Sequence, residues 1–275
     1  MIKFNNERTF GVEIEFVSKD NANRLVVELM SRGLKVQKVP YGCSVPSGHW
    51  KVTTDSSVEP NGSQIRRGYC GRGLELVSPI LKGQEGIEAL RLACEALEAS
   101  ESEVNASAGL HVHHGTDDLT VENFKNVHRI YSRFEGTFDS MMPNSRRRNN
   151  KHLIKSLRGL DYYKPAFARA ESIDQFLNVN EDRYYKLNFQ SYRTHSTIEF
   201  RHHSGTVEFA KIKHWVYFTQ AIIERSHKAV QDKDYNESSD RWLRLVDQIF
   251  GNKAKDAEMG EAIKHFRKRI KKLAS

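Results

Sequence analysis

The amino-acid sequence predicts an α+β fold. Short apolar runs with a period of two, such as TFGVEIEF at 9–16 and GLHVHH at 109–114, predict strands. Longer runs with a period near 3.6, such as QEGIEALRLACEALEAS at 84–100, predict helices. The two kinds of run do not follow the regular βαβ order of a parallel α/β protein. At 275 residues the chain is long enough to bury a sizeable core.

The expected elements follow in order from the strand at 9–16. A capped helix over 20–33 ends at Gly33, and a strand covers 34–39. We expect an edge strand and turn at 50–58, between polar loops at 40–49 and 59–73, and a further strand at 74–81. The remaining elements are a helix at 84–100, a strand at 109–114, a helix at 119–138, strands near 184–190 and 196–202, and helices near 207–230, 239–250 and 257–273.

Composition narrows the class of protein and of partner. Lys and Arg number 43 against 35 Asp and Glu, which gives a net charge of +8 and favours anionic partners such as nucleotides, nucleic acids or acidic polymers. Part of this charge lies in NSRRRNN (144–150) and KHFRKRIKK (264–272), and such runs are most often solvated faces. Three cysteines without a CxxC pair argue against a disulfide framework. With neither a signal peptide nor a membrane span in the sequence, we expect a cytoplasmic protein.

Four of the expected strands combine an apolar face with a face of ionisable side chains. In TFGVEIEF, Glu13 and Glu15 share one face, and the opposite face is apolar: Val12, Ile14 and Phe16. The two carboxylates lie roughly 6.6 Å apart along the strand and repel each other by about 2.5 kcal/mol at a protein-like dielectric constant. This repulsion requires a compensating charge.

The other three strands add groups of the same kind. GLELVSP carries Glu75, and GLHVHHG carries His111 and His113 on one face. TIEFRHH carries Glu199 and Arg201 on one face. If the four strands pair in one sheet, their polar faces form a wall of four carboxylates and one imidazole: Glu13, Glu15, Glu75, His111 and Glu199.

Such a wall predicts bound cations. Oxygen-rich ligand sets suit Mg²⁺ or Mn²⁺, and Mg²⁺ acts through few carboxylates together with water and substrate phosphates. A zinc site would need the HxH pair and a further ligand, which His114, His202 or His203 would supply. Because carboxylates outnumber imidazoles in the wall, magnesium is the preferred interpretation.

Each motif alone also has a simpler explanation. ExE on a strand is most often a solvent-exposed face, and an HxH pair at a surface needs no function. Glu199 and Arg201 fit an exposed cross-strand ion pair worth less than about 1 kcal/mol. The combination of all three motifs in short apolar strands favours a site.

Six segments of the chain, FGVEIEF, WKVTTDSSV, GLELVSPIL, GLHVHH, PNSRRRNN and YYKLNFQSYRTHSTIEFRHHSGT, resemble in this order the amidoligase family. These are ATP-dependent carboxylate–amine ligases related to glutamine synthetase and glutamate–cysteine ligase. The resemblance spans residues 9–206 and leaves the C-terminal helices unmatched. It implies a glutamine synthetase-like fold: a curved, mainly antiparallel sheet with helices on its outer face and with ATP and divalent cations on its concave face. We therefore expect an amidoligase-like catalytic domain at 1–230 and a charged helical extension at 231–275.

The resemblance also implies roles for single residues. The expected ligands of Mg²⁺ or Mn²⁺ are the five members of the wall: Glu13, Glu15, Glu75, His111 and Glu199. His113 is expected near the nucleotide or the substrate. Arg201 is expected on the transferring phosphate, and Arg146 and Arg147 on the phosphates of ATP. Trp50, Asp55 and Asn188 occupy motif positions and are expected to contact substrate.

The chemistry of amide formation explains these residue types. A carboxylate resists attack by an amine, so an enzyme first transfers the γ-phosphoryl group of ATP to it and makes an acyl phosphate. Phosphoryl transfer depends on positioning and charge neutralisation, which metal ions and an arginine supply, and Arg201 is the expected catalytic arginine. The amine must attack unprotonated, and Asp55 is the expected general base. An Asp before two serines also fits a residue that organises a turn.

Two other functions fit part of the pattern. A metal-dependent hydrolase or nuclease would use the same acidic wall without a nucleotide. A basic nucleic-acid-binding module would use the triplet Arg146, Arg147 and Arg148, which on spacing fits a nucleic-acid patch as well as it fits ATP phosphates. A P-loop is not supported, since GxxxxGK[ST] is missing, and GYCGRG precedes a strand rather than a helix. The sequence leaves open which carboxylate and which amine are joined: an amino acid, a peptide, a polyamine or a modified base.

Overall fold

The computed structural model of the chain describes residues 3–147, 154–228, 240–251 and 257–274. These residues form two compact units. The first unit comprises residues 6–113 and 203–213, and the second comprises residues 1–5, 114–202 and 214–275. Both contain helices and strands, so the predicted α+β class is confirmed. Within the described ranges no helix combines the length and the hydropathy of a membrane span. The predicted boundary at residue 230 lies outside the described residues, and the division there stays a prediction.

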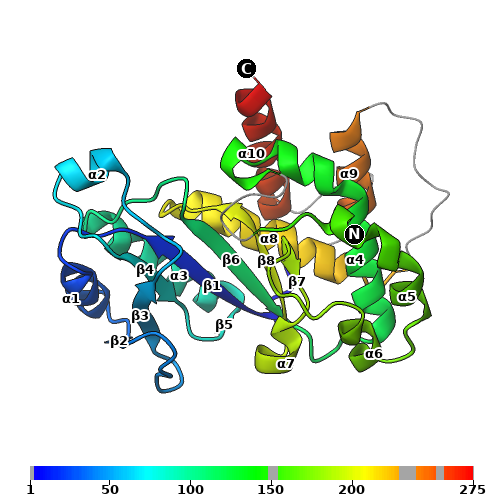
Figure 1. The fold of residues 1–275 in the computed structure, drawn as a ribbon, viewed down its shortest axis with the longest axis horizontal. Helices are drawn as coiled ribbons and strands as arrows, with labels where there is room; N and C mark the ends of the chain where they lie inside the picture. Colours follow the sequence, from blue (N-terminus) through cyan, green and yellow to red (C-terminus); the bar gives the residue numbers. More distant parts are fainter. Residues whose placement is uncertain (1–2, 148–153, 229–239, 252–256, 275) are drawn as a thin grey trace. The chain divides into compact units, whose positions relative to one another are not determined.

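The strands of the first unit form a mixed sheet (Figure 1). Neighbours hydrogen-bond in the order β2 (Val36–Lys38), β3 (Trp50–Asp55), β4 (Gly73–Val77), β1 (Thr9–Phe16) and β6 (Gly109–Gly115), and β5 (Leu81–Lys82) pairs with β1. Strands β3, β4, β1 and β5 pair antiparallel, as predicted, whereas β2 pairs parallel with β3. The apolar face of β1 is confirmed as core, because its three residues are at most 1% exposed: Val12, Ile14 and Phe16.

The prediction of an edge strand at 50–58 is wrong. Strand β3 lies between β2 and β4, and Trp50 donates its backbone N–H to the carbonyl of Lys35 at 2.7 Å. The side chain of Trp50 is only 1% exposed, so this strand begins in the core. The preceding segment is the edge because it is short and polar, with two exposed residues in three.

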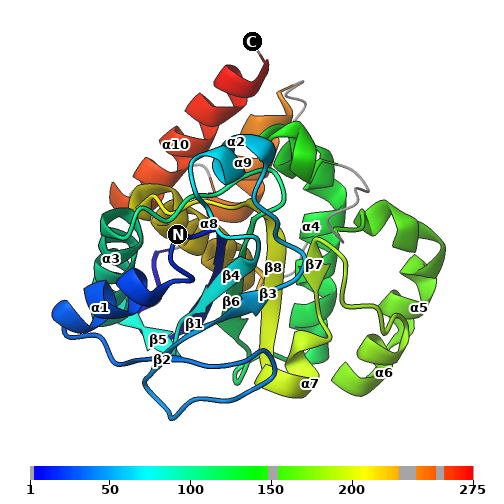
Figure 2. The ribbon, with the colours of Figure 1, turned by 60° about the vertical axis from the view of Figure 1, so that its left-hand side comes forward.

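Two helices of the first unit pack together beside its strands. Helix α1 (Asn23–Ser31) contacts α3 (Gly83–Ala99), as Figure 2 shows. The predicted stop of α1 at Gly33 is confirmed: this glycine has φ +77°, and the next residue, Leu34, donates to the carbonyl of Leu29 at 3.1 Å. The bounds of α3 agree with the predicted helix at 84–100 to within one residue.

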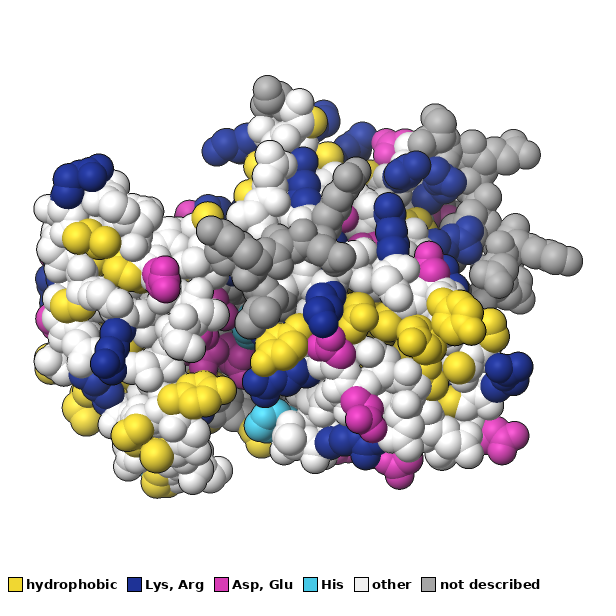
Figure 3. Space-filling view, viewed as in Figure 1, with side chains coloured by type: hydrophobic (Ala, Val, Ile, Leu, Met, Phe, Trp, Pro, Cys, Tyr) yellow, Lys and Arg dark blue, Asp and Glu magenta, His cyan; other side chains and the backbone are white. Residues whose placement is uncertain are grey.

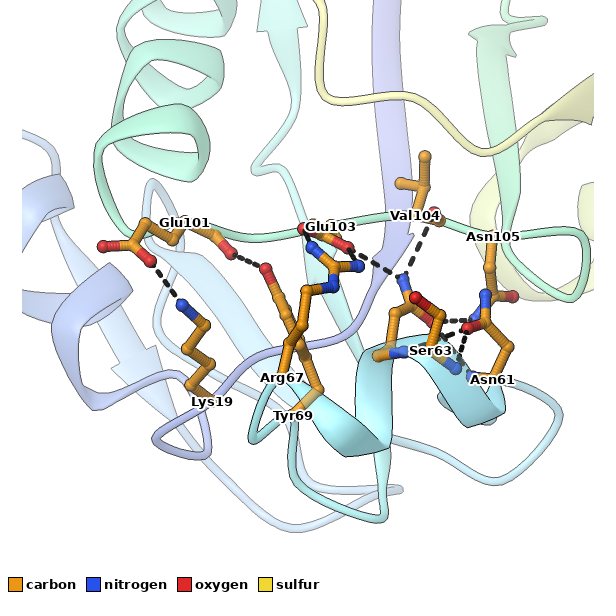
Figure 4. Close-up of polar contacts among 10 residues, drawn as sticks. Lys19, Asn61, Ser63, Arg67, Tyr69, Glu101, Glu103, Val104 and Asn105 are labelled. Carbon is orange, nitrogen blue, oxygen red and sulfur yellow. Dashed lines mark hydrogen bonds and ion pairs between the residues drawn. The ribbon is translucent and has the colours of Figure 1, made fainter.

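A polar network holds the segment at 59–73, which the sequence predicts to be a polar loop (Figure 4). It contains the short helix α2 (Gly62–Arg66), which Asn61 and Gln64 cap reciprocally. Side chains of this loop bind the segment that follows α3. Gln64 and Arg67 donate hydrogen bonds to the carboxylate of Glu103, and Tyr69 donates its hydroxyl to the carbonyl of Glu101 at 2.9 Å. The guanidinium of Arg67 lowers the pKa of Glu103 to about 2.

The second unit is mainly helical. Its elements are α4 (Val121–Ser140), η1 (Asn144–Arg146), η2 (Leu157–Tyr163), α5 (Lys164–Arg169), α6 (Ile173–Asn178), β7 (Leu187–Asn188), α7 (Ser191–His195), β8 (Thr197–Ser204), α8 (Phe209–Arg225), α9 (Arg241–Phe250) and α10 (Ala257–Ala274); the end of β8 and the start of α8 belong to the first unit. The predicted helices at 119–138, 239–250 and 257–273 are confirmed. The strand expected near 184–190 is only the two residues of β7.

Aromatic side chains form much of the core of the second unit. Phe124 of α4 packs against Phe176 and Phe189, with ring centroids 5.9 and 5.8 Å away. Phe218 of α8 contacts Phe250 of α9 and Phe266 of α10 at 5.4 and 5.2 Å. These contacts hold α6, α9 and α10 against the long helices of the same unit.

Candidate metal centre

Strands β3, β4 and β1 place three polar side chains in a row. The register pairs Thr53 with Glu75 and Glu15 with Glu75. Residues directly opposite in antiparallel strands point to the same face, so all three share one face of the sheet. Two carboxylates opposite each other destabilise a sheet when both are charged. Glu15 is 4% exposed, so water cannot screen this repulsion effectively.

Strand β6 adds an imidazole to the two carboxylates. His111 Nε2 lies 3.3 Å from Glu15 Oε1, and its Nδ1 lies 2.9 Å from Glu13 Oε2. One ligand atom from each of three residues, Glu15, Glu75 and His111, lies within 4.8 Å of the other two. We call this group the metal centre. The backbone N–H of Gly109 donates to Glu15 Oε2 at 2.6 Å and holds that carboxylate in place.

Burial and mutual repulsion shift the acidity of the carboxylates. Burial raises the pKa of Glu75 well above its usual range, and the charges of Glu13, Glu15 and Asp55 raise it further. Burial also acts to raise the pKa of Glu13, but hydrogen bonds and charge from the imidazoles of His111 and His113 outweigh it and lower that pKa. Burial and repulsion both disfavour the charged form of Glu75, and a divalent cation would remove the cause of the shift.

The residues present fit a hard divalent cation. Two carboxylates and one imidazole leave room for water ligands, which Mg²⁺ and Mn²⁺ retain. The hydroxyl oxygen of Thr53, beside Glu75 in the row, is buried and has no hydrogen-bond partner among the described residues. An unsatisfied buried hydroxyl at this position fits a site that a hydrated ion completes.

Several simpler explanations do not agree with the structure. His111 and His113 are 4% and 9% exposed, so the HxH pair is not a surface feature, and His113 Nε2 lies 3.3 Å from Glu13 Oε1. The histidines of the zinc alternative have other neighbours. His114 lies 2.7 Å from the hydroxyl of Thr219. His202 lies 2.8 Å from that of Tyr131, and His203 lies 2.7 Å from the carbonyl of Ser204.

In the second unit, β7 and β8 place three predicted site residues together. Asn188 pairs in register with Glu199 and donates its side-chain N–H to Glu199 Oε2 at 2.6 Å. Arg201 Nη1 contacts the other oxygen of Glu199 at 2.5 Å. The ion pair lies within one strand rather than across strands, and Glu199 is 4% exposed. The simple surface-pair explanation is therefore not supported.

The remaining predicted residues have structural contacts of their own. Arg146 is 2% exposed, and Arg147 donates its Nε–H to the carbonyl of Met142 at 2.7 Å. Arg148 lies outside the described residues. Asp55 Oδ1 accepts both the N–H and the hydroxyl of Ser57 at 2.7 Å, so Asp55 does organise a turn. The roles predicted for these residues and for the buried Trp50 stay predictions.

A family model described as "putative amidoligase enzyme" matches residues 6–223. The chain belongs to the amidoligase family. No match was found among the curated proteins. The matched range includes every residue of the metal centre and the group around Glu199, and it ends inside α8, so α9 and α10 lie beyond the amidoligase match.

The second unit of this amidoligase-family chain also contains a largely buried charge network that the sequence motifs do not predict. In the second unit, Lys186 Nζ lies 2.8 Å from Glu135 and 2.6 Å from Asp139. Asp139 also lies 2.9 Å from His202, whose other nitrogen faces Tyr131. The signal was present: Tyr131, Glu135 and Asp139 follow at intervals of four, so they share one face of α4. The spacing alone does not show that this face is buried, because Lys186 and His202, which contact it, are distant in the sequence.

Proposed function

We propose that the protein is an ATP-dependent ligase that joins a carboxylate to an amine through an acyl phosphate, with Mg²⁺ or Mn²⁺ as its cation. We also propose that it shares the fold and the superfamily of glutamine synthetase and glutamate–cysteine ligase. The observation that carries the proposal is the metal centre of the first unit, where the buried carboxylate of Glu15 faces the partly buried carboxylate of Glu75 beside an imidazole, because such a group suits a cation that neutralises phosphate. Family membership supports the reaction type.

The residues of the metal centre would hold the cation, and the cation would offset the negative charge of ATP phosphates during transfer. Glu15 and Glu75 supply carboxylate oxygens, and His111 supplies a ring nitrogen. Glu13 contacts Nδ1 of His111 and so orients the ring with Nε2 toward Glu15. A carboxylate that orients a ligand histidine raises its basicity and strengthens metal binding.

Roles for the second unit rest on the resemblance of the sequence and on local contacts. Asn188 and Arg201 fix the carboxylate of Glu199, which we propose as a further cation ligand. We propose that Arg201 also contacts the transferring phosphate and that Arg146 and Arg147 bind ATP phosphates. His113 would lie near nucleotide or substrate, and Trp50 would contact substrate. Asp55 would accept a proton from the amine through Oδ2, since Oδ1 accepts two hydrogen bonds.

The first test measures cation binding by itself. Saturating Mn²⁺ at 100 times its dissociation constant would stabilise the protein by about 2.7 kcal/mol, which raises the melting temperature by roughly 5–10 °C. Glu75→Gln should abolish this shift and stabilise the metal-free protein by up to about 1 kcal/mol, because it removes carboxylate repulsion. The matched control is Glu59→Gln, an exposed carboxylate of the same unit. An unchanged Mn²⁺ shift in Glu75→Gln would contradict the metal centre.

The second test measures the reaction. Purified protein with Mg²⁺ and ATP is offered a panel of amino acid, peptide and polyamine pairs, and release of ADP and phosphate is followed. The ligase proposal requires substrate-dependent release that is lost in Glu75→Gln and Arg201→Ala and kept in Glu59→Gln. Cleavage of phosphodiesters with metal alone would instead favour the hydrolase or nuclease alternative. A chain that binds no ATP in the presence of Mg²⁺ would not be a ligase of this kind.

A further inference from the structure

The C-terminal helix of the second unit separates its apolar and basic residues sharply. Its buried face consists of Met259, Ala262 and Phe266. The ring of Phe266 lies 5.6 Å from Trp215 and 5.2 Å from Phe218, both on α8 of the same unit. The apolar face of α10 is thus used in the core of its own unit.

Exposed cations follow the other side of α10 at positions i, i+3, i+4, i+7 and i+8. These residues, which we call the basic stripe, are all exposed: Lys264, Arg267, Lys268, Lys271 and Lys272. At 1.5 Å per residue the stripe spans about 12 Å. Figure 3 shows Lys and Arg side chains on the part of the surface that α10 occupies in Figure 1. Six basic and two acidic residues give this helix a charge of +4, half of the net charge of the whole chain.

Most cations of the basic stripe have no counter-charge beside them in the described part of the chain. No acidic residue occurs from 262 to 274, and four of the five cations have no ion-pair partner among the described residues: Lys264, Arg267, Lys268 and Lys271. Like charges at i and i+4 destabilise a helix, and the stripe contains three such pairs. The helix dipole favours cations only in the last turn, so it does not account for the first three residues of the stripe. A polyanion outside the chain would relieve this repulsion.

We propose that the basic stripe binds the phosphate backbone of nucleic acid without regard to sequence. The regularly spaced cations of the stripe match the regularly spaced charges of a phosphate backbone. The stripe has no aromatic residue on which a base could stack, so it offers no contact that depends on the bases. An anionic membrane is the less favoured partner, because amphipathic helices bind membranes by inserting their apolar face, and that of α10 is packed against Trp215 and Phe218. This binding does not depend on the metal centre.

The test compares two triple variants of the full chain that remove the same charge. Lys264→Gln/Lys268→Gln/Lys271→Gln neutralises part of the basic stripe, and the control Lys35→Gln/Arg66→Gln/Arg72→Gln removes three exposed cations from the first unit. Binding to labelled duplex DNA and to RNA of equal length is measured by fluorescence anisotropy over a series of salt concentrations. Each lost phosphate contact lowers the slope of log K against log salt by about 0.9, so the stripe variant should lose about 2.7 from its slope.

The outcomes are distinct. A slope that falls in the stripe variant and not in the control supports the proposal, provided that neither variant melts at a lower temperature than the wild type; relief of the repulsion within α10 should raise the melting temperature of the stripe variant slightly. Equal losses in both variants would mean that net charge alone attracts nucleic acid, and that result overturns it. Stripe-dependent binding to vesicles containing phosphatidylserine, without binding to either nucleic acid, also overturns it.

A second inference comes from the buried hydroxyl of Thr53. Its side chain is 3% exposed, and Oγ1 has no hydrogen-bond partner among the described residues. A buried hydroxyl left unpaired is costly, so its retention beside Glu75 calls for a partner that binds there. We infer that Thr53 is a positioning residue whose hydroxyl hydrogen-bonds the hydration shell of the bound cation. This inference rests on the proposed function.

Thr53→Val removes the hydroxyl and keeps the shape of the side chain. In EDTA this variant should melt at a higher temperature than the wild type, because an unpaired polar group is gone. Its Mn²⁺ affinity, measured by titration calorimetry, should fall about tenfold, as for other outer partners of metal ligands. Thr53→Ser should restore the affinity, and Thr54→Val, on the opposite face of β3, should leave it unchanged.

The result of Glu75→Gln separates the two proposals. If that variant loses Mn²⁺ while Thr53→Val binds as tightly as the wild type, the inference about Thr53 is wrong and the metal centre stands. If no protein, including the wild type, binds Mn²⁺, the proposed function fails with it.

Discussion

Removal of the Lys186 side chain should destabilise the second unit strongly. Its ammonium group is fully buried and lies within 2.8 Å of two carboxylates, of which Glu135 is 1% exposed and Asp139 is 18% exposed. In Lys186→Met the carboxylate of Glu135 would stay buried without a counter-ion. Breaking a buried ion pair in this way costs about 3–5 kcal/mol. That is a large share of the roughly 5–15 kcal/mol by which proteins of ordinary stability are folded.

The double variant Lys186→Met/Glu135→Leu tests the electrostatic origin of this cost. Replacing both charges by apolar groups removes the uncompensated carboxylate, and Asp139 keeps its contact with His202 at 2.9 Å. The double variant should therefore recover at least about 2 kcal/mol of the loss. Lys164→Met is the matched control: its partner Asp161 lies 2.8 Å away, and both side chains are more than half exposed, so the cost should stay below about 1 kcal/mol.

The assay is urea unfolding at neutral pH, followed by tryptophan fluorescence and analysed from the midpoint and the slope of each transition. Trp215 and Trp242 report on the second unit because both are buried in it. A loss of stability below about 1 kcal/mol in Lys186→Met would refute the reasoning, because the buried carboxylate of Glu135 would then not need the ammonium group of Lys186 as its counter-ion. A double variant less stable than the single one would refute it equally.

Two further predictions concern stability alone. Burial lowers the pKa of His128 to about 4, whereas the unfolded chain binds this proton near pH 6.5. Between these two pH values a falling pH protonates the unfolded chain but not the folded one, so the folded protein loses stability. The protein should therefore lose about 2 kcal/mol between pH 7 and pH 5 through this residue, and His128→Gln should flatten that part of the pH profile; parallel profiles would contradict the prediction. Gly73→Ala should cost about 3 kcal/mol or more, because a Cβ there would lie 2.3 Å from the side chain and carbonyl of Val58, whereas Gly71→Ala meets open space and should cost less than about 0.5 kcal/mol. Thermal melts of both alanine variants check this, and equal melting temperatures would show that β4 shifts to make room.

The local alternation of apolar and polar residues was sufficient to predict the strands that carry the metal centre. Alternation in β1 predicts which residues are buried, and the same alternation predicts that Glu13 and Glu15 share a face. The sequence could not show that Glu75 stands directly opposite Glu15, because register depends on how two distant segments pair. It also placed the strand at 50–58 at an edge, since the parallel partner β2 leaves no local mark on it.

What the sequence by itself determined is the set of chemical groups and the class of fold, because the periodicity of apolar residues is a local property. It also determined the family, through motifs spread in order along the chain. Only the tertiary structure decided which groups share a dielectric environment: the opposition of Glu15 and Glu75, the unpaired hydroxyl of Thr53 and the burial of Lys186. The physical reason is that burial and pairing are properties of contacts between distant segments, and the free energy of a charge depends on those contacts rather than on its neighbours in the chain.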